Sequence, residues 1–502
     1  MIDKLNEKNQ NSIFDDLLNN LDDENNNEEL INYFILPENE GWNYRSGKER
    51  LSILHILVKK NLFDLLKQII DITKQNTSEE IFNKFVNSKD IKGRTPFLYA
   101  CFFSNIKTIK FLLNNGVEYN VKDNKGRNCL HLSAIRNKVT PIYYMIKKYN
   151  MNIYEKDNDG NTFFHWACSF CSENVIYFFL DDKNFNVNIP DNKGNIPLHY
   201  YLDSGNCNCL KRLILYGADP YMKNNEGKNS FDVVNEKYST KDKKKKKHVL
   251  SILRTKYYNN FQYWCFMFFH IIFIFLIILF QFPFIDKKYI LVFFLIWTFF
   301  IWSFILYFIS LDSGTFKKNS GNYLLTLIDE NENDINLLKY CIKCQIKKEL
   351  YTKHCFYCDK CIKDFDHHCY WLNKCIGKNN KYHFNILIVF LLINSYVYFI
   401  PFYFAQKNER IMNLETLLKI FFLSNLSTLQ KMKIFIFYLY LLFLISINII
   451  ILPLIKFCLE QKHKNNMLYK DRINKTEPLI EMSEIVNEET INLLDENNNN
   501  NN

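Results

Sequence analysis

The feature that most constrains the fold of this chain is a repeat in its first half. Short segments that begin with Asp or Asn and end with Gly recur at intervals of 33, 34, 34 and 33 residues. They start at Asp90, Asp123, Asp157, Asp191 and Asn224. A unit of this length cannot bury its own apolar face, so each copy must be covered by the next. The sequence therefore predicts a solenoid of stacked units.

Each copy also carries the start of a helix. Two residues after the Gly comes a motif such as Thr-Pro-Phe-Leu-Tyr-Ala at 95–100 or Ile-Pro-Leu-His at 196–199, and 51–55 looks like an earlier, degenerate copy. The period and the motif together resemble ankyrin repeats, which implies about six repeats over 46–238. His131, His165 and His199 recur within the motif, and their place in the repeat favours a structural hydrogen-bonding role over metal binding.

Charge is unevenly distributed along the chain. The net charge is +10, but the densest block is a run of lysines at 243–247 within a basic linker at 239–260, not a basic groove, so we expect no nucleic-acid partner. The acidic, Asn-rich tail at 1–45 and the tail at 459–502 have the composition of disordered segments, and the first residues do not form a signal peptide.

Four runs in the second half are uncharged and apolar, at 261–285, 289–311, 384–404 and 434–455. Each is long enough to cross about 30 Å of hydrocarbon, which predicts a four-helix transmembrane bundle in contact with membrane lipid, with helices at 261–311 and 384–458. The lysine block before the first run places both termini in the cytosol. The loop at 312–383 would then also be cytosolic.

The cysteines gather in that loop. Seven of the fifteen cysteines lie between 341 and 375, together with three histidines. Thiols at two-residue spacings in a reducing compartment favour zinc over disulfides. Two sites of four ligands would need eight groups and leave two of these ten unused, although spacing alone does not say which two.

The Asp-His-His-Cys sequence at 366–369, the cysteine spacing and the order of apolar runs resemble DHHC-type protein S-acyltransferases (palmitoyltransferases), of which one branch carries ankyrin repeats. The resemblance covers about residues 50 to 460. It implies a mainly all-α fold: an ankyrin solenoid, then the transmembrane bundle, with a small zinc-bound cysteine-rich domain at 312–383. It also implies an endomembrane location, commonly the Golgi.

Site roles follow from the same resemblance. One structural zinc ion would take Cys341, Cys344, His354 and Cys361, and a second would take Cys355, Cys358, His368 and Cys375. Cys369 would attack a long-chain acyl-CoA such as palmitoyl-CoA and carry the acyl group, His367 would act as the base, and Asp366 would orient the imidazole. Protein cysteines would receive the acyl group, and the ankyrin repeats would recruit those proteins.

Other functions are compatible with parts of the sequence. A catalytically silent, membrane-tethered ankyrin scaffold would keep the repeats and the zinc module but form no acyl-enzyme. A membrane-bound RING-like ubiquitin ligase also uses interleaved zinc sites, but the contiguous Asp-His-His-Cys between two apolar runs argues against it. An ankyrin-bearing cation channel is weakened by the lack of a recognisable pore loop.

Overall fold

A computed structural model describes residue 31 and residues 45–254 and 288–397, with short gaps at 183, 205–208, 239–241, 320, 332–334, 356 and 370–371. The predicted apolar runs at 261–285 and 434–455 lie outside the described residues. Nearly all residues of the two predicted tails also lie outside the described residues. The chain divides into two compact units, one of residues 1–257 and 317–347 and one of residues 258–316 and 348–502.

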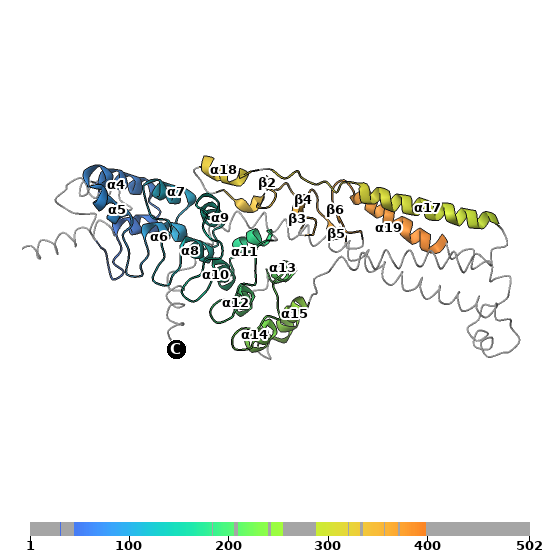
Figure 1. Ribbon diagram of the computed structural model, residues 1–502, viewed down its shortest axis with the longest axis horizontal. Coiled ribbons are helices and arrows are strands. Elements are labelled where there is room, and N and C mark those ends of the chain that lie inside the picture. The colour runs from blue at the N-terminus through green and yellow to red at the C-terminus, as the bar shows by residue number, and fades with distance from the viewer. Residues whose placement is uncertain are drawn as a thin grey trace, which may run out of the picture. The chain divides into compact units, whose positions relative to one another are not determined.

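Helical pairs joined by hairpin loops build most of the first unit (Figure 1). The helices that begin each repeat stack on one another in chain order. These are α3 (Ile53–Lys59), α6 (Pro96–Phe103), α8 (Cys129–Ile135), α10 (Phe163–Ser169), α12 (Pro197–Ser204) and α14 (Ser230–Lys237). The second helices are α4 (Phe63–Asn76), α7 (Ile106–Asn114), α9 (Val139–Lys148), α11 (Glu173–Leu180) and α13 (Leu210–Leu215), with α5 (Glu79–Val86) and α15 (Lys243–Leu253) in addition.

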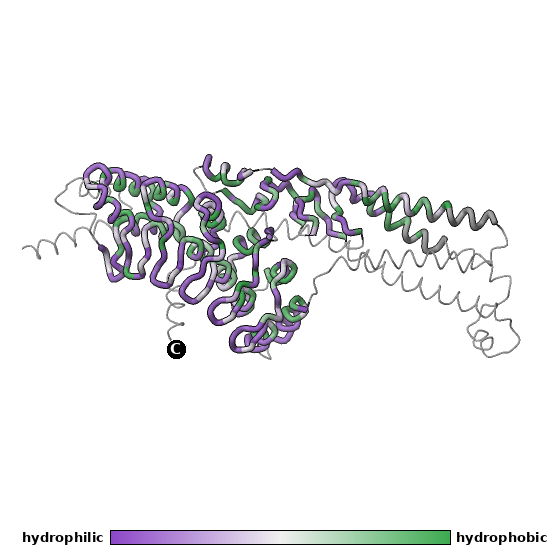
Figure 2. The backbone as a smooth tube through the Cα atoms, in the orientation of Figure 1, coloured by the Kyte–Doolittle hydropathy of each residue, from purple (hydrophilic) through white to green (hydrophobic). Residues whose placement is uncertain are grey.

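The repeated Asp-x-x-Gly segment forms the turn that the sequence predicts. The carboxylate of Asp90 accepts hydrogen bonds from the backbone N–H groups of Lys92 and Arg94 at 3.0 and 2.7 Å, and Gly93 adopts φ +75°. Thr95 then caps the next helix, with Pro96 in its first turn. Polar hairpin loops therefore alternate with apolar helices along the stack (Figure 2).

An asparagine ladder ties the hairpin tips together. The side-chain amide of Asn158 donates to the carbonyl of Asn124 at 3.0 Å, and that of Asn192 donates to the carbonyl of Asn158 at 3.0 Å. The same side chain fills the space over the preceding turn, where a Cβ on Gly126 would lie 2.3 Å from Asn158 Oδ1. Each repeat thus positions the next through its backbone as well as through its core.

The repeated histidines are buried and join neighbouring repeats. Nδ1 of His131 accepts from the backbone N–H of Asn128 at 3.1 Å, so Nε2 carries the proton and donates to the carbonyl of Asn161 at 3.0 Å. His165 makes the equivalent bonds to Thr162 and Asn195. Burial lowers the pKa of both histidines to about 4. Their role is structural, as their place in the motif predicts.

The first unit also includes part of the cysteine-rich loop. Residues 317–347 contain α18 (Tyr323–Glu330), the 3-10 helix η5 (Leu337–Lys339) and the antiparallel strands β1 (Tyr340–Cys341) and β2 (Ile346–Lys347). α18 contacts α9, and η5 contacts α11. No motif in the sequence predicts this association.

Two helices and two small hairpins form the described part of the second unit. Strands β3 (Lys353–Cys355) and β4 (Lys360–Ile362) pair antiparallel, as do β5 (His367–Cys369) and β6 (Lys374–Ile376). The helices α17 (Lys288–Ser310) and α19 (Lys381–Val397) contact each other. The chain is thus mostly helical, with a repeat solenoid and a cysteine-rich module, and this part of the predicted fold class is confirmed.

The predicted location is wrong. Searched over the described residues, the structure contains no helix with the length and apolar character needed to cross a membrane. This contradicts a multi-pass integral membrane protein of the Golgi with both termini in the cytosol. Some apolar side chains of the predicted runs, such as Phe308 of α17 and Leu387 of α19, pack in a protein core with the cysteine-rich module.

Candidate functional site

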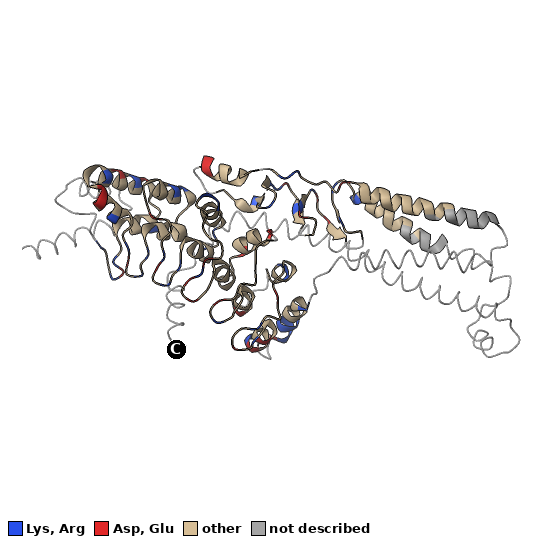
Figure 3. Cartoon of the chain, in the orientation of Figure 1, with Lys and Arg blue, Asp and Glu red and all other residues tan. Residues whose placement is uncertain are grey.

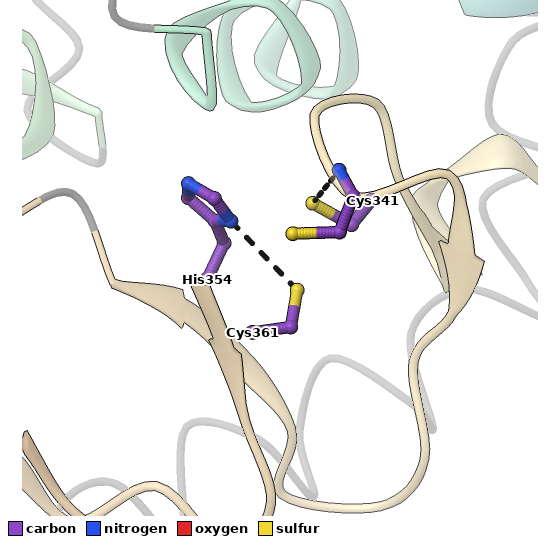
Figure 4. Close-up of side chains that lie close together, drawn as sticks. Cys341, His354 and Cys361 are labelled. Carbon is purple, nitrogen blue, oxygen red and sulfur yellow. Dashed lines mark hydrogen bonds between the residues drawn. The ribbon is translucent and has the colours of Figure 1, made fainter. Parts of the chain in front are cut away.

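Eight of the predicted site residues gather into two groups of possible metal ligands. The first group is Cys341, Cys344, His354 and Cys361, and the second is Cys355, Cys358, His368 and Cys375. Within each group the ligand atoms all lie within 4.8 Å of one another. Figure 4 shows His354 and Cys361 turned toward Cys341. These are the two sets of four that the family resemblance implies.

The Cys-x-x-Cys turns prepare the thiols for a metal. The backbone N–H of Cys344 points at Cys341 Sγ at 3.4 Å, and that of Gln345 donates to the carbonyl of Cys341 at 2.8 Å. The turn at Cys355–Cys358 is built the same way, with distances of 3.5 and 2.9 Å. Gln345 and Asp359, which follow the two turns, both adopt φ +54°. Backbone N–H groups directed at sulfur favour thiolates, the form that binds metal.

Hairpin pairing supplies the remaining ligands of the first group. His354 and Cys361 are paired across β3 and β4, and Nδ1 of His354 lies 3.8 Å from Cys361 Sγ. On the other side of the ring, Nε2 lies 3.4 Å from the carboxylate of Asp359. A carboxylate on this side of a ligating imidazole favours the tautomer that has its proton on Nε2, although the pair does not have hydrogen-bond geometry here. Asp359 had not been predicted, although its place directly after Cys358 was a usable signal.

The second group has the dimensions of a tetrahedral zinc site. His368 Nδ1 lies 3.7, 3.4 and 3.6 Å from the sulfurs of Cys355, Cys358 and Cys375. With Zn–S of about 2.3 Å and Zn–N of about 2.0 Å, a tetrahedral site separates sulfur from nitrogen by about 3.5 Å. The hydrogen-bonding thiol of Cys355 lowers the pKa of Cys358. The ring of Tyr357 stacks on His368 at 4.8 Å. This donor set fits zinc.

Strand alternation separates these ligands from the predicted catalytic residues. Successive side chains of a strand point to opposite faces. His368 in β5 faces the metal group, so His367 and Cys369 share the other face. Cys369 is 4% exposed and belongs to an apolar cluster. That cluster contains Ile301, Ile305, Phe308, Leu372, Ile376, Phe384 and Leu387.

His367 lies between an acid and an aromatic ring. Its Nδ1 is 3.9 Å from the carboxylate of Asp366, and its ring packs edge-on against Phe384 at 5.2 Å. Burial lowers the pKa of His367, while Asp366 opposes this shift. The imidazole is therefore neutral near pH 7 and able to accept a proton. A thiol, a neutral imidazole and a carboxylate in this order can perform nucleophilic acyl transfer.

A buried clamp fixes the strand that carries Cys375. The carbonyl of Cys375 accepts hydrogen bonds from the Ser313 hydroxyl at 2.8 Å and from the Asn380 side chain at 2.9 Å. The backbone N–H of Gly377 donates to Asn380 Oδ1 at 2.9 Å, and a Cβ on Gly377 would lie 2.4 Å from the Ser313 carbonyl. The clamp positions β6 and, through it, the β5 strand.

Comparisons with known proteins agree with this arrangement. Residues 334–471 match the DHHC palmitoyltransferase family. Three overlapping segments, at 23–123, 54–156 and 130–224, match ankyrin repeats. The first match contains all eight candidate ligands and the Asp-His-His-Cys sequence, and the ankyrin matches cover the stacked helices from α3 to α13.

Two individual proteins are also similar to parts of the chain. One, from Saccharomyces uvarum, is named a probable palmitoyltransferase and is 29% identical over 105 residues, which is 21% of this chain and 14% of that protein. The other, from Acanthamoeba polyphaga mimivirus, is named for its ankyrin repeats and is 26% identical over 96 residues, or 19% of this chain and 12% of that protein. The chain thus spans about one seventh or less of the length of these relatives.

Proposed function

Because the chain combines a DHHC palmitoyltransferase domain with ankyrin repeats, we propose that it is a protein S-acyltransferase that works through an acyl-enzyme on Cys369. The observation that carries the proposal is the face of β5 on which His367 and Cys369 lie together, away from the metal groups. A thiol that served only as a metal ligand would lie on the other face, with His368.

The first half-reaction forms the acyl-enzyme. His367 takes the proton of the Cys369 thiol, and the thiolate attacks the thioester carbonyl of an acyl-CoA. A new carbon–sulfur bond forms to Cys369, the bond to the CoA sulfur breaks, and the proton passes from His367 to that sulfur. Asp366, 3.9 Å from Nδ1, stabilises the imidazolium between these transfers.

The second half-reaction repeats the same steps with a protein thiol. His367 deprotonates the incoming cysteine, whose sulfur attacks the acyl-enzyme carbonyl, and the Cys369 sulfur leaves and is reprotonated. One thioester replaces another in each half-reaction, so neither needs an oxidant or an energy source. Bound zinc would hold the two hairpins together, since this module has few apolar residues of its own.

The surroundings of Cys369 support a long acyl chain as the group transferred. Ile305 and Phe308 of α17 and Leu387 of α19 are all buried in the cluster that contains Cys369. A thioester on this sulfur would begin at an apolar surface, where each methylene removed from water contributes about 0.8 kcal/mol. Palmitoyl-CoA is the co-substrate that we propose.

The ankyrin repeats are the proposed site for protein substrates. Stacked repeats present an extended concave surface on which they bind other proteins. In this chain α9 and α11, which are second helices, are contacted by the chain's own residues 317–347. Substrate proteins would therefore use the hairpin side of the repeats.

Labelling with an alkyne-tagged palmitate analogue tests the proposal. Wild-type protein should acquire label that neutral hydroxylamine removes, and Cys369→Ser should acquire none. Cys209→Ser is a matched control because Cys209 is also a buried cysteine, in the repeat unit, and it should label like the wild type. Equal labelling of the Cys369→Ser variant, or no label in folded, zinc-loaded wild type, would favour a silent scaffold instead.

A further inference from the structure

A segment of the cysteine-rich loop is held by the second helices of the repeats. Within the first unit, α18 lies beside α9 (Figure 1). The 3-10 helix η5 contacts α11. The β1–β2 hairpin follows directly, and its turn carries Cys341 and Cys344. Cys341 and Cys344 are therefore part of the unit that the repeats build.

The C-terminal end of α18 is acidic (Figure 3) and contacts basic residues of the repeats. The ammonium group of Lys110 donates to the carbonyls of Ile328, Asp329 and Asn331. Lys148 forms an ion pair with the Asp329 carboxylate at 2.7 Å. The last carbonyls of a helix lack partners within the helix and carry partial negative charge, so a lysine at this end is stabilising.

Two further contacts continue along the segment toward the cysteines. The hydroxyl of Thr140 in α9 donates to the carbonyl of Ile335 at 3.1 Å. Lys343, between the two cysteines of the turn, lies 3.2 Å from the Asp182 carboxylate, which follows α11. The repeats thus contact both the approach to the turn and the turn itself.

The most direct link is between Tyr143 and Gln345. Tyr143 in α9 is 1% exposed, and its hydroxyl lies 3.1 Å from Nε2 and 3.4 Å from Oε1 of Gln345. Oε1 also accepts from the backbone N–H of Leu324 at 3.1 Å, and Nε2 donates to the carbonyl of Ile342 at 2.6 Å. The amide is therefore held from the repeats, from α18 and from the turn.

Gln345 directly follows Cys344 and shapes the turn. Its backbone N–H donates to the carbonyl of Cys341, and it holds φ +54° although it is not glycine. This conformation is unfavourable for residues with a Cβ and persists where surrounding contacts hold it. The side-chain amide makes those contacts, so losing one of them should relax the turn.

We propose that Tyr143 is a positioning residue for the first metal group: through Gln345, the ankyrin repeats hold the Cys341–Cys344 turn in the geometry that zinc requires. The second metal group serves as an internal reference. Its Cys355–Cys358 turn is followed by Asp359, as the first turn is followed by Gln345, but it lies outside the unit that the repeats build. The inference rests on zinc binding under the proposed function but not on acyl transfer. The repeats would then support the zinc module as well as bind substrates.

Zinc release from the full-length protein tests this assignment. Transfer of zinc to a chromogenic chelator is followed for wild type and Tyr143→Phe, which removes only the hydroxyl and keeps the buried ring against Phe178. Because a single hydrogen bond contributes about 1 kcal/mol, one of the two zinc ions should leave about fivefold faster. Timed alkylation with peptide mass spectrometry should show faster modification of Cys341 and Cys344 and unchanged rates at Cys355 and Cys375.

Two further variants separate positioning from loosening of the repeats. Tyr201→Phe removes another buried tyrosine hydroxyl, one that accepts from the Cys209 backbone within the repeats, and it should leave both zinc release rates unchanged. Gln345→Asn shortens the amide yet tolerates positive φ. Adding Tyr143→Phe to Gln345→Asn should accelerate zinc release no further than Gln345→Asn alone.

Several outcomes would overturn the proposal. If Tyr143→Phe released zinc and was alkylated at the wild-type rates, the hydroxyl would not position the turn. Equal acceleration in Tyr201→Phe would assign the effect to general loosening. Additive effects of the two substitutions at 143 and 345 would remove the link between them. If the wild-type protein bound no zinc, Tyr143 could not position a zinc ligand turn. This outcome would overturn the proposal even if the protein transferred acyl groups.

Discussion

Mild acid should destabilise the ankyrin repeats through their buried histidines. His55, His131 and His165 are at most 1% exposed, and burial lowers the pKa of each to about 4 from an ordinary value of 6.5. In each ring Nδ1 accepts from a backbone N–H, at 3.1, 3.1 and 3.0 Å respectively. A protonated imidazole cannot accept that bond, so the folded repeats require the neutral form.

The magnitude follows from proton linkage. Between pH 6.5 and pH 4 the unfolded chain binds protons that the folded chain does not, so the free energy of unfolding falls as the pH falls. At pH 5 the free energy of unfolding is lower than at neutral pH by about 2 kcal/mol for each histidine and by about 6 kcal/mol for all three. The stabilisation that the neutral histidines provide is complete above pH 6.5 and declines as the pH falls below that value.

Hydrogen exchange of the full-length protein measures this effect repeat by repeat. After correction for intrinsic exchange rates, peptides from α8 and α10 should show opening free energies several kcal/mol lower at pH 5 than at pH 7. His131→Gln, which does not titrate, should have a pH dependence smaller by about 2 kcal/mol. Equal opening free energies at the two pH values would refute the reasoning, as would an unchanged pH dependence in the variant.

Three further outcomes are expected. Gly377→Ala would place a Cβ 2.4 Å from the Ser313 carbonyl, so the free energy of unfolding of the cysteine-rich module should fall by about 3 kcal/mol. The measurement is the thermal midpoint, and an unchanged midpoint would show that the surrounding backbone accommodates the methyl group. Asn158→Ala removes a ladder bond and should lower urea-unfolding stability by about 1 kcal/mol, whereas an effect below the error would make the ladder dispensable. His367→Gln should slow acyl-enzyme formation by about 10²–10⁴-fold, measured as the burst of released CoA; a wild-type burst would exclude it as the base.

The sequence predicted the repeat architecture well because that architecture is local. A period of 33 or 34 residues, a glycine at each turn and a helix cap at a fixed offset are all visible in the chain. The structural role of His131 follows from the same register. The asparagines of the ladder, such as Asn124 and Asn158, are equally regular in the sequence. Their hydrogen bonds join residues one repeat apart, and only the three-dimensional structure shows them.

The cysteine-rich module was only partly predictable. Cysteine and histidine spacing predicted metal binding, and strand alternation explains why His367 and Cys369 separate from the metal ligands. The contact of Tyr143 with Gln345 joins positions about two hundred residues apart, and no local pattern marks it. The location could not be predicted from composition, because apolar residues in such a run can also pack in a protein core, as Phe308 and Leu387 do.

Single-turnover acyl transfer tests the central claim most directly. Purified, zinc-loaded protein is mixed with palmitoyl-CoA, freed of excess CoA ester and then mixed with a cysteine-containing acceptor protein, with peptide mass spectrometry at each stage. The acyl group should appear first on the peptide that contains Cys369, should be absent in Cys369→Ser, and should then move to the acceptor as it leaves Cys369. An acyl group that reached the acceptor at the same rate in Cys369→Ser would contradict the acyl-enzyme.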